Sequence, residues 1–242
     1  MREIDGVAEL KHDLPQLVEI LARTARWVHP EIFKLLPVWH PEHCRRSPLY
    51  DATWTRRSTN SGKDKFEANV LAGKALRAAL GLSKPKNFTT CHIWGFDDPK
   101  FSKRGGITYD AKFYSCTANL ILVPSPLKAL TDCVPEIQGM LRSCAYFLYG
   151  FIPDHENVSV DFKNQMRKGE VHELYPQRWP RSGDKLLPPN TAEYSDSIVQ
   201  RIEKRKEQLR ANLENPGEHY PTDQVRSVLK YWKSKTGFDL YG

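Results

Sequence analysis

Apolar side chains recur every three or four residues in the first part of the chain. This spacing predicts an amphipathic helix over about residues 14–28, which Pro30 would end. The same periodicity predicts a second helix over residues 64–80 with a basic outer face. Residues 33–48 are rich in proline and aromatic residues, so we expect irregular structure there with a short helical piece at most.

Short apolar runs rich in β-branched and aromatic residues replace this pattern in the middle of the chain. Residues 87–94 and 119–123 predict two strands, and a short strand is also expected over 107–114, within the polar connection between them. A short helical segment near 126–130 precedes a longer helical pattern over 135–149. The middle is therefore expected to run strand, long loop, strand, helix.

Prolines interrupt the chain after residue 150, where only residues 157–162 have the pattern of a strand. Ser197 and Gln200 resemble a capping box and predict a helix that continues to about Leu213. A last helix is predicted over residues 222–235. We expect one α+β domain over residues 1–242, comprising a helical N-terminal part (1–86), a core (87–150), and an irregular arm with C-terminal helices (151–242).

Composition and charge narrow the class of protein. The 242 residues are 40% hydrophobic and 27% charged, and no run approaches the roughly 20 apolar residues of a membrane span. Lys and Arg number 36 against 29 Asp and Glu, and the net charge of +7 suits a polyanionic partner. The five cysteines include no CxxC pair, which argues against a disulfide scaffold or a four-cysteine zinc site. We expect a soluble cytoplasmic protein with reduced thiols and no membrane partner.

The candidate chemistry lies in the predicted strands and the helix after them. His92 ends the first strand and Asn119 opens the second. At these residues the sequence resembles the HNH branch of the ββα-metal nucleases, whose two strands supply a catalytic His and a central Asn. The resemblance implies a ββα-metal core within a largely helical domain, His92 as the general base for phosphodiester hydrolysis, and Asn119 as a metal ligand or orienting residue. A histidine can deprotonate water near neutral pH, while Mg²⁺ or Mn²⁺ offsets the charge that develops on the phosphate.

Two positions depart from the HNH pattern, and both concern the metal. Cys91 stands where the family commonly has Asp or His, and Lys128 where the helix commonly carries His or Asn. Neither is a natural ligand of a hard cation. The resemblance leaves two ligand sets open. In one, Asn119 alone holds a hydrated ion; in the other, Asp132 is the helix ligand and Lys128 contacts the phosphate.

Each of these residues also has a purely structural interpretation. His92 can be a hydrogen-bonded structural residue, and Cys91 a small buried filler. Asn119 can close a turn with its side chain, and Asp132 can cap the helix near whose start it is expected.

A second nuclease pattern overlaps the first. Asp97 or Asp98, followed by Asp110 and Lys112, resembles the PD-(D/E)xK arrangement, in which two acids bind Mg²⁺ and the lysine orients the water. This alternative requires Asp110 and Lys112 to lie on the expected strand at 107–114. Because the pattern is degenerate, we rank it below the HNH resemblance.

Two further clusters carry polar side chains. His40, His43 and Cys44 are of the types that bind zinc, but no second ligand pair stands at a typical spacing, so packing and loop hydrogen bonds are the favoured interpretation. Arginine, hydroxyl and amide side chains follow Trp54, and these types contact phosphates and base edges. A solvated loop is the alternative. The predicted nucleic-acid-binding residues are Arg56, Arg57, Lys63, Lys65 and Arg104.

These patterns favour a metal-dependent DNA endonuclease that acts on double-stranded DNA. The catalytic candidates are His92, Asn119 and Lys128, and the candidates for a Mg²⁺ or Mn²⁺ site are Asn119 and Asp132. The large surround favours a sequence-specific, restriction-type enzyme by analogy. Cutting both strands of a palindrome requires two active sites, which a homodimer would supply. The alternative is a non-catalytic nucleic-acid-binding protein on a degenerate nuclease scaffold.

Overall fold

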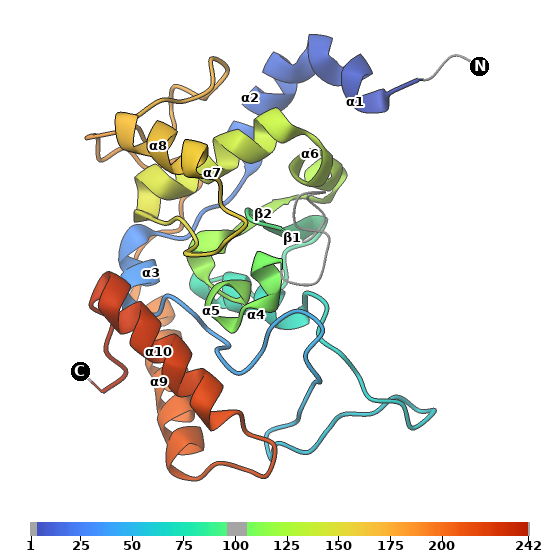
Figure 1. The fold of residues 1–242 in the computed structure, drawn as a ribbon, viewed down its shortest axis with the longest axis vertical. Helices are drawn as coiled ribbons and strands as arrows, with labels where there is room; N and C mark the ends of the chain where they lie inside the picture. The colour runs from blue at the N-terminus through green and yellow to red at the C-terminus, as the bar shows by residue number, and fades with distance from the viewer. Residues whose placement is uncertain (1–3, 96–105, 242) are drawn as a thin grey trace.

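A two-stranded antiparallel sheet lies at the centre of a mainly helical α+β structure (Figure 1). The computed structural model describes residues 4–95 and 106–241. Strand β1 (Phe88–His92) pairs with β2 (Leu120–Pro124) in a register that sets Phe88 opposite Pro124 and His92 opposite Leu120. The two predicted strands are therefore confirmed, with His92 as the last residue of β1 and Asn119 directly before β2.

Helices follow the second strand as the sequence predicts. After η4 (Ser125–Leu127), α6 (Lys128–Cys133) leads into α7 (Pro135–Tyr149). A proline occupies the first turn of α7, where no backbone N–H is needed, and Gly150 ends the helix at a φ of 67°, a left-handed conformation that glycine adopts without strain. The prediction of a helix over 135–149 is confirmed at both ends.

The N-terminal helices are shorter than their patterns predict. They are α1 (Gly6–Glu9), η1 (Leu10–Asp13), α2 (Leu14–Thr24), α3 (Pro30–Leu35) and α4 (Val70–Ala79). Helix α2 stops before residue 28 because Arg26 forms an isolated bridge with Leu122, its N–H donating to that carbonyl at 2.9 Å. Helix α4 begins at Val70 because residues 64–67 are engaged in a separate extended structure described below. Helix α4 packs on both strands.

The connection between the strands is helical where a strand was expected. Residues 107–114 form η2 (Ile107–Tyr109) and α5 (Ala111–Tyr114), and η3 (Thr117–Asn119) leads into β2. Asp110 caps α5, since its Oδ1 accepts a hydrogen bond from the Lys112 N–H at 2.8 Å. This local cap outweighs the β-propensity of the aromatic and branched residues around it, and the prediction of a strand at 107–114 is wrong.

The C-terminal part contains α8 (Val160–Lys168), α9 (Asp196–Glu214) and α10 (Thr222–Thr236). The strand expected over 157–162 is wrong, because the Ser159 hydroxyl caps α8 by accepting from the Phe162 N–H at 3.2 Å. The capping box expected at Ser197 is also wrong: the N-cap of α9 is Ser195, whose hydroxyl lies 3.2 Å from that of Ser197. The two C-terminal helices themselves are confirmed.

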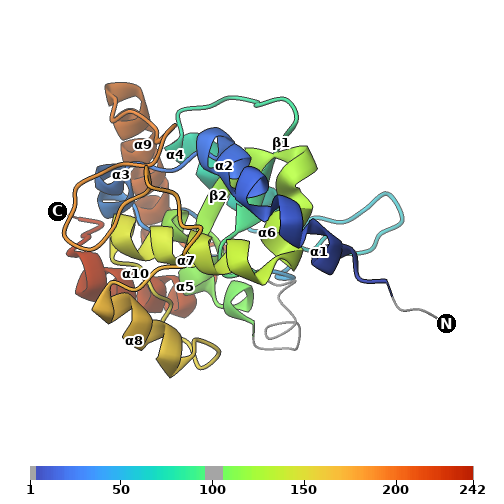
Figure 2. The same cartoon turned by 90° about the horizontal axis from the view of Figure 1, so that it is seen from above.

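One cluster of buried apolar side chains runs through all three parts of the chain. It includes Leu21 of α2, Leu122 of β2, Ile202 of α9 and Trp232 of α10. Seen from above, α2 and α6 lie toward the right of the view and α9 and α10 toward the left, and α7 runs across the middle between them (Figure 2). Among the described residues, no helix combines the length and apolar character needed to cross a bilayer.

Candidate functional site

His92 is the last residue of β1 and is 7% exposed. Its Nε2 lies 2.8 Å from the carbonyl oxygen of Tyr114. Because a carbonyl oxygen only accepts hydrogen bonds, Nε2 must carry the proton, which places the lone pair of the neutral ring on Nδ1. The fold therefore selects the tautomer in which Nδ1 is the basic nitrogen.

Asn119 ties together the two ends of the connection between the strands. It is fully buried at the end of η3. Its Oδ1 accepts from the Trp94 N–H at 2.8 Å, and its Nδ2 donates to the Phe113 carbonyl at 3.1 Å. The side-chain amide thus bonds to the protein at both ends, as an orienting residue does, and Asn119 is not exposed to solvent.

Three backbone carbonyl groups of α5 accept hydrogen bonds from side chains of other elements. A helix C-terminus leaves backbone carbonyls without helical partners, and in α5 side chains from elsewhere occupy them. His92 takes the carbonyl of Tyr114 and Asn119 that of Phe113, while Trp232 of α10 donates from Nε1 to the Lys112 carbonyl at 3.0 Å. A helix of one turn is thereby fixed to β1, η3 and α10.

The side chain of Tyr114 anchors this short helix to the segment before α4. Its hydroxyl donates to Oε1 of Glu67 at 2.5 Å, and Glu67 is only 1% exposed. Burial, together with this carboxylate, raises the pKa of Tyr114 well above its usual range. The hydroxyl therefore keeps the proton with which it binds Glu67.

A small cavity brings His92 and Asp132 together. It is also lined by Gly95, Thr131 and Arg142, and its volume is about 10 Å³. A space of roughly 10–15 Å³ is the least that holds one water molecule. The structure thus places two of the predicted site residues, one from β1 and one from α6, around a space of about the size of one water.

Asp132 and Lys128 form an ion pair across one turn of α6. The interpretation of Asp132 as a cap of the helix that follows is wrong, because the N-cap of α7 is Val134 and no described side chain caps that helix. The Asp132 side chain is 18% exposed, and that of Lys128 is 45% exposed. The lysine that stands at a usual ligand position therefore compensates the charge of the carboxylate beside the cavity.

The residues around His92 do not form a fully protein-ligated cation site. Cys91 is buried, the amide of Asn119 is bonded at both ends, and the described residues contain no group of three His, Cys, Asp or Glu arranged around a common point. Asp132 supplies the one carboxylate that lines the cavity, which has room for about one water and not for a hydrated cation. Mg²⁺ binds through one or two carboxylates, so Asp132 is the lining residue whose chemical type suits it.

The residues of the PD-(D/E)xK alternative are not arranged as that pattern requires. Asp110 caps α5 and pairs with Lys112 at 3.0 Å, and both residues belong to a helical segment and not to a strand. Asp97 and Asp98 lie outside the described residues. The strand on which this alternative depends is absent from the described segment 106–116.

The aromatic and histidine cluster near residue 43 is packed together. His43 is 6% exposed, stacks on Trp54 with ring centroids 5.7 Å apart, and places Nδ1 3.2 Å from the Ser47 hydroxyl. Burial lowers the pKa of His43, which favours the neutral ring. His40 and Cys44 flank it, and burial also lowers the pKa of His40.

An extended structure over residues 46–67, here called the basic arm, projects from the body of the molecule (Figure 1). Its three backbone segments are joined by hydrogen bonds of 2.8 Å: Leu49 N–H to the Lys65 carbonyl, Lys65 N–H to that of Arg57, and Arg57 N–H to that of Leu49. Lys65 therefore lies in this arm, and the prediction that residues 64–69 begin the helix is wrong.

The arm exposes most of the predicted nucleic-acid-binding residues. Arg57, Lys63 and Lys65 are exposed and form no ion pair with any described residue, whereas Arg56 pairs with Asp64 at 3.2 Å. Arg104 lies outside the described residues. The basic arm ends at Glu67, which accepts the hydrogen bond from the Tyr114 hydroxyl. This bond therefore connects the basic arm to the residue whose carbonyl orients His92.

Two parts of the site carried no sequence signal. The Tyr114 carbonyl is a backbone group that every residue possesses, and Glu67 is far from His92 in the chain. The chain matches no protein-family model, no curated protein and no solved structure, so the description of this site rests on its own geometry.

Proposed function

We propose that the protein is a metal-dependent DNA endonuclease, and that His92 is its general base. The observation that carries this proposal is the placement of His92 at the end of β1, with Nε2 bonded to the Tyr114 carbonyl and with His92 and Asp132 both lining a water-sized cavity. An oriented imidazole beside a carboxylate is what in-line hydrolysis of a phosphodiester requires.

In the proposed reaction, Nδ1 of His92 accepts a proton from a water molecule. The water oxygen then bonds to phosphorus as the bond to the leaving oxygen breaks, and solvent protonates the leaving group. The Tyr114 carbonyl stabilises the imidazolium by accepting from Nε2–H, and Asn119 acts as a positioning residue. Mg²⁺ or Mn²⁺ held at Asp132 would neutralise charge on the scissile phosphate, and Lys128 lies beside the same group.

The basic arm supports duplex DNA as the substrate. Its exposed Arg57, Lys63 and Lys65 form no ion pair with a described residue, and such side chains bind DNA phosphates with a release of condensed counterions that favours binding. We further propose that the activity is sequence-specific, as in a restriction-type enzyme. The arm would then contact bases as well as attract the phosphates nonspecifically. Two active sites are needed to cut a palindrome, so the restriction-type proposal also includes a homodimer.

The test is cleavage of plasmid DNA, duplex libraries and RNA in Mg²⁺ or Mn²⁺. His92→Ala should lower the rate by roughly a hundred- to ten-thousand-fold, the usual contribution of a general base. His12→Ala is the matched control because His12 is exposed on η1, far from the cavity residues in sequence. His92→Gln, which keeps a polar side chain at the strand end, covers the case in which the alanine variant does not fold.

Wild-type cleavage by a folded His92 variant would remove His92 from the mechanism. The second candidate is a non-catalytic nucleic-acid-binding protein, which is favoured by the neutralisation of Asp132 by Lys128. Salt-sensitive DNA binding without cleavage in either metal would support it against the nuclease.

A further inference from the structure

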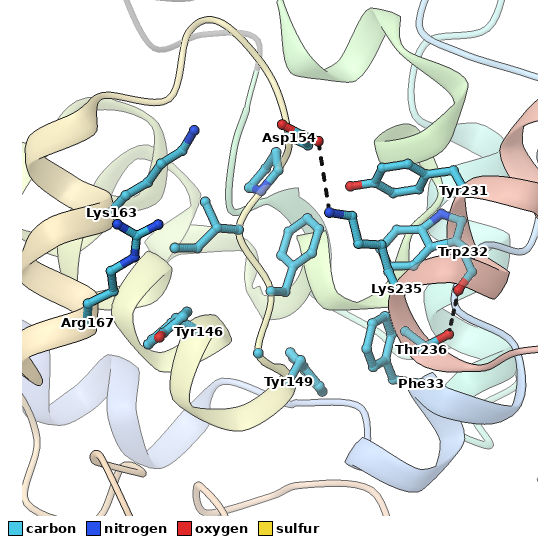
Figure 3. A pocket seen from close by; sticks show the side chains of 14 residues that line it. Phe33, Tyr146, Tyr149, Asp154, Lys163, Arg167, Tyr231, Trp232, Lys235 and Thr236 are labelled. Carbon is cyan, nitrogen blue, oxygen red and sulfur yellow. Dashed lines mark hydrogen bonds and ion pairs between the residues drawn. The ribbon is translucent and has the colours of Figure 1, made fainter.

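A cavity of about 370 Å³ lies between α7, α8, α10 and residues 150–154, outside the site proposed for hydrolysis (Figure 3). This volume lies within the range of small-molecule sites, roughly 300–1,000 Å³. Three buried rings line its floor. Trp232 packs against Phe33 with ring centroids 5.6 Å apart and against Phe151 at 6.1 Å. The floor is thus a fixed aromatic surface.

One wall of this cavity carries two positive charges. Lys163 and Arg167 lie one turn apart on α8, and both line the cavity (Figure 3). Neither makes a hydrogen bond or an ion pair with any described residue. On the opposite wall, Lys235 of α10 lies 3.9 Å from Asp154. The single lining carboxylate is therefore near Lys235, while the two cations of α8 face the cavity without an acidic partner among the described residues.

Tyr146 of α7 completes the cationic side. It lines the cavity below Arg167 in Figure 3, its side chain is half-buried, and its hydroxyl makes no hydrogen bond with a described residue. Its ring and hydroxyl offer a stacking face and a polar contact. A simple anion would leave the aromatic floor without a contact. An uncharged aromatic ligand would leave the two positively charged side chains without a contact. The lining fits a ligand that contains both a ring and a phosphate.

We propose that this cavity binds a nucleotide, with its base against Tyr146 and the aromatic floor and its phosphate on Lys163 and Arg167. Arginine and lysine bind phosphate through charge-assisted hydrogen bonds, and aromatic rings stack on bases. The nucleotide can be free in solution or a single nucleotide of a strand, since both present the same ring and phosphate.

Isothermal titration of the full chain with AMP, GMP, CMP and UMP in metal-free buffer tests this site. Saturable binding of at least one mononucleotide is expected, with adenosine and inorganic phosphate each binding at least about tenfold more weakly because each lacks one half of the ligand. Lys163→Gln combined with Arg167→Gln should weaken nucleotide binding about tenfold or more, since two charge-assisted bonds are lost.

Lys168→Gln is the control, and it removes one positive charge from the same helix. The Lys168 side chain is 69% exposed, and it is 3.7 Å from Glu170 and not in the cavity lining. This variant should bind nucleotides as the wild type does. Tyr146→Leu should weaken nucleotide binding but leave phosphate binding unchanged.

Three results would overturn the proposal: no saturable binding at millimolar nucleotide, equal binding by the double variant, or phosphate binding as tight as nucleotide binding. A short single-stranded oligonucleotide that displaces the mononucleotide identifies a strand as the source, and one that does not displace it identifies a free nucleotide. Because the assay needs no cleavage, and His92→Ala should bind nucleotides normally, failure here and failure of the nuclease proposal are separate outcomes.

Discussion

Asn119→Ala is the substitution whose effect can be worked out most fully from the structure. It removes the bond from the Trp94 N–H at 2.8 Å and the bond to the Phe113 carbonyl at 3.1 Å, in a residue that is 0% exposed. The Trp94 N–H loses its bond in a buried site, which costs about 1–3 kcal/mol, whereas the Phe113 carbonyl keeps a bond from the Cys116 N–H at 3.4 Å and loses about 0.5–1.5 kcal/mol. The expected loss in the free energy of unfolding is therefore about 1.5–4.5 kcal/mol, a substantial part of the roughly 5–15 kcal/mol of a typical domain.

Activity should fall as well, because the Phe113 carbonyl that loses this bond is next to the Tyr114 carbonyl that orients His92. On the proposed role of Asn119 as a positioning residue that does not contact DNA, kcat should fall while the Kd for DNA is unchanged. Asn119→Asp retains the acceptor for the Trp94 N–H but loses the donor, and separates the two bonds.

Urea unfolding followed by circular dichroism measures the stability, and single-turnover cleavage measures kcat. The control is Asn164→Ala, an exposed asparagine on α8, which should change the free energy of unfolding by less than about 0.5 kcal/mol. A loss below about 1 kcal/mol at Asn119 with unchanged kcat would refute the assignment of Asn119 as a positioning residue.

Three further predictions concern the metal, the arm and pH. Asp132→Asn should raise the Mg²⁺ concentration needed for half-maximal cleavage, whereas Asn119→Ala should lower cleavage even at saturating Mg²⁺; cleavage that persists in EDTA would contradict the metal mechanism. Alanine at Arg57 or Lys65 in the basic arm should reduce the slope of log affinity against log salt by roughly 0.9 for each lost phosphate contact, measured on duplex DNA in Ca²⁺; unchanged slopes would place the DNA elsewhere. Because burial lowers the pKa of both His40 and His43 below the usual 6.5 in the folded state, the unfolded chain binds the extra protons first, so stability should be full above about pH 6.5 and fall as the pH drops below it, by at most about 1.4 kcal/mol per pH unit for each histidine. Unfolding midpoints at several pH values check this, and His43→Gln should reduce the dependence to the part that His40 contributes.

The sequence predicts those elements whose ends are marked by local chemistry. Pro135 and Gly150 mark the two ends of helix α7. The two strands are predicted by short apolar runs whose side chains must be buried. The segment before α4 was not predictable, because the helical periodicity of residues 64–69 competes with cross-chain hydrogen bonds that only the folded arm provides. The segment 107–114 shows the reverse case, in which the single cap at Asp110 outweighs strand propensity.

The candidate site was predictable only as far as its side chains are concerned. His92 and Asp132 were identified from the resemblance to the HNH nucleases, and both line one cavity. What orients His92 is a backbone carbonyl, and what holds that carbonyl is a glutamate 47 residues away from Tyr114 in the chain. Backbone acceptors have no residue signature, and long-range partners leave no spacing to detect in one sequence.

The anchoring of α5 also sets an order in time during synthesis. The bonds that His92 and Asn119 make to its carbonyls close within 22 and 6 residues, so they are available as soon as β2 has left the ribosome. The bond from Trp232 to the Lys112 carbonyl spans 120 residues and must wait until α10 has been made. A nascent chain can therefore form the strand pair of the site early, but it gains the bond from Trp232 only when synthesis has passed α10. The candidate site would reach its complete set of supporting bonds only at that stage.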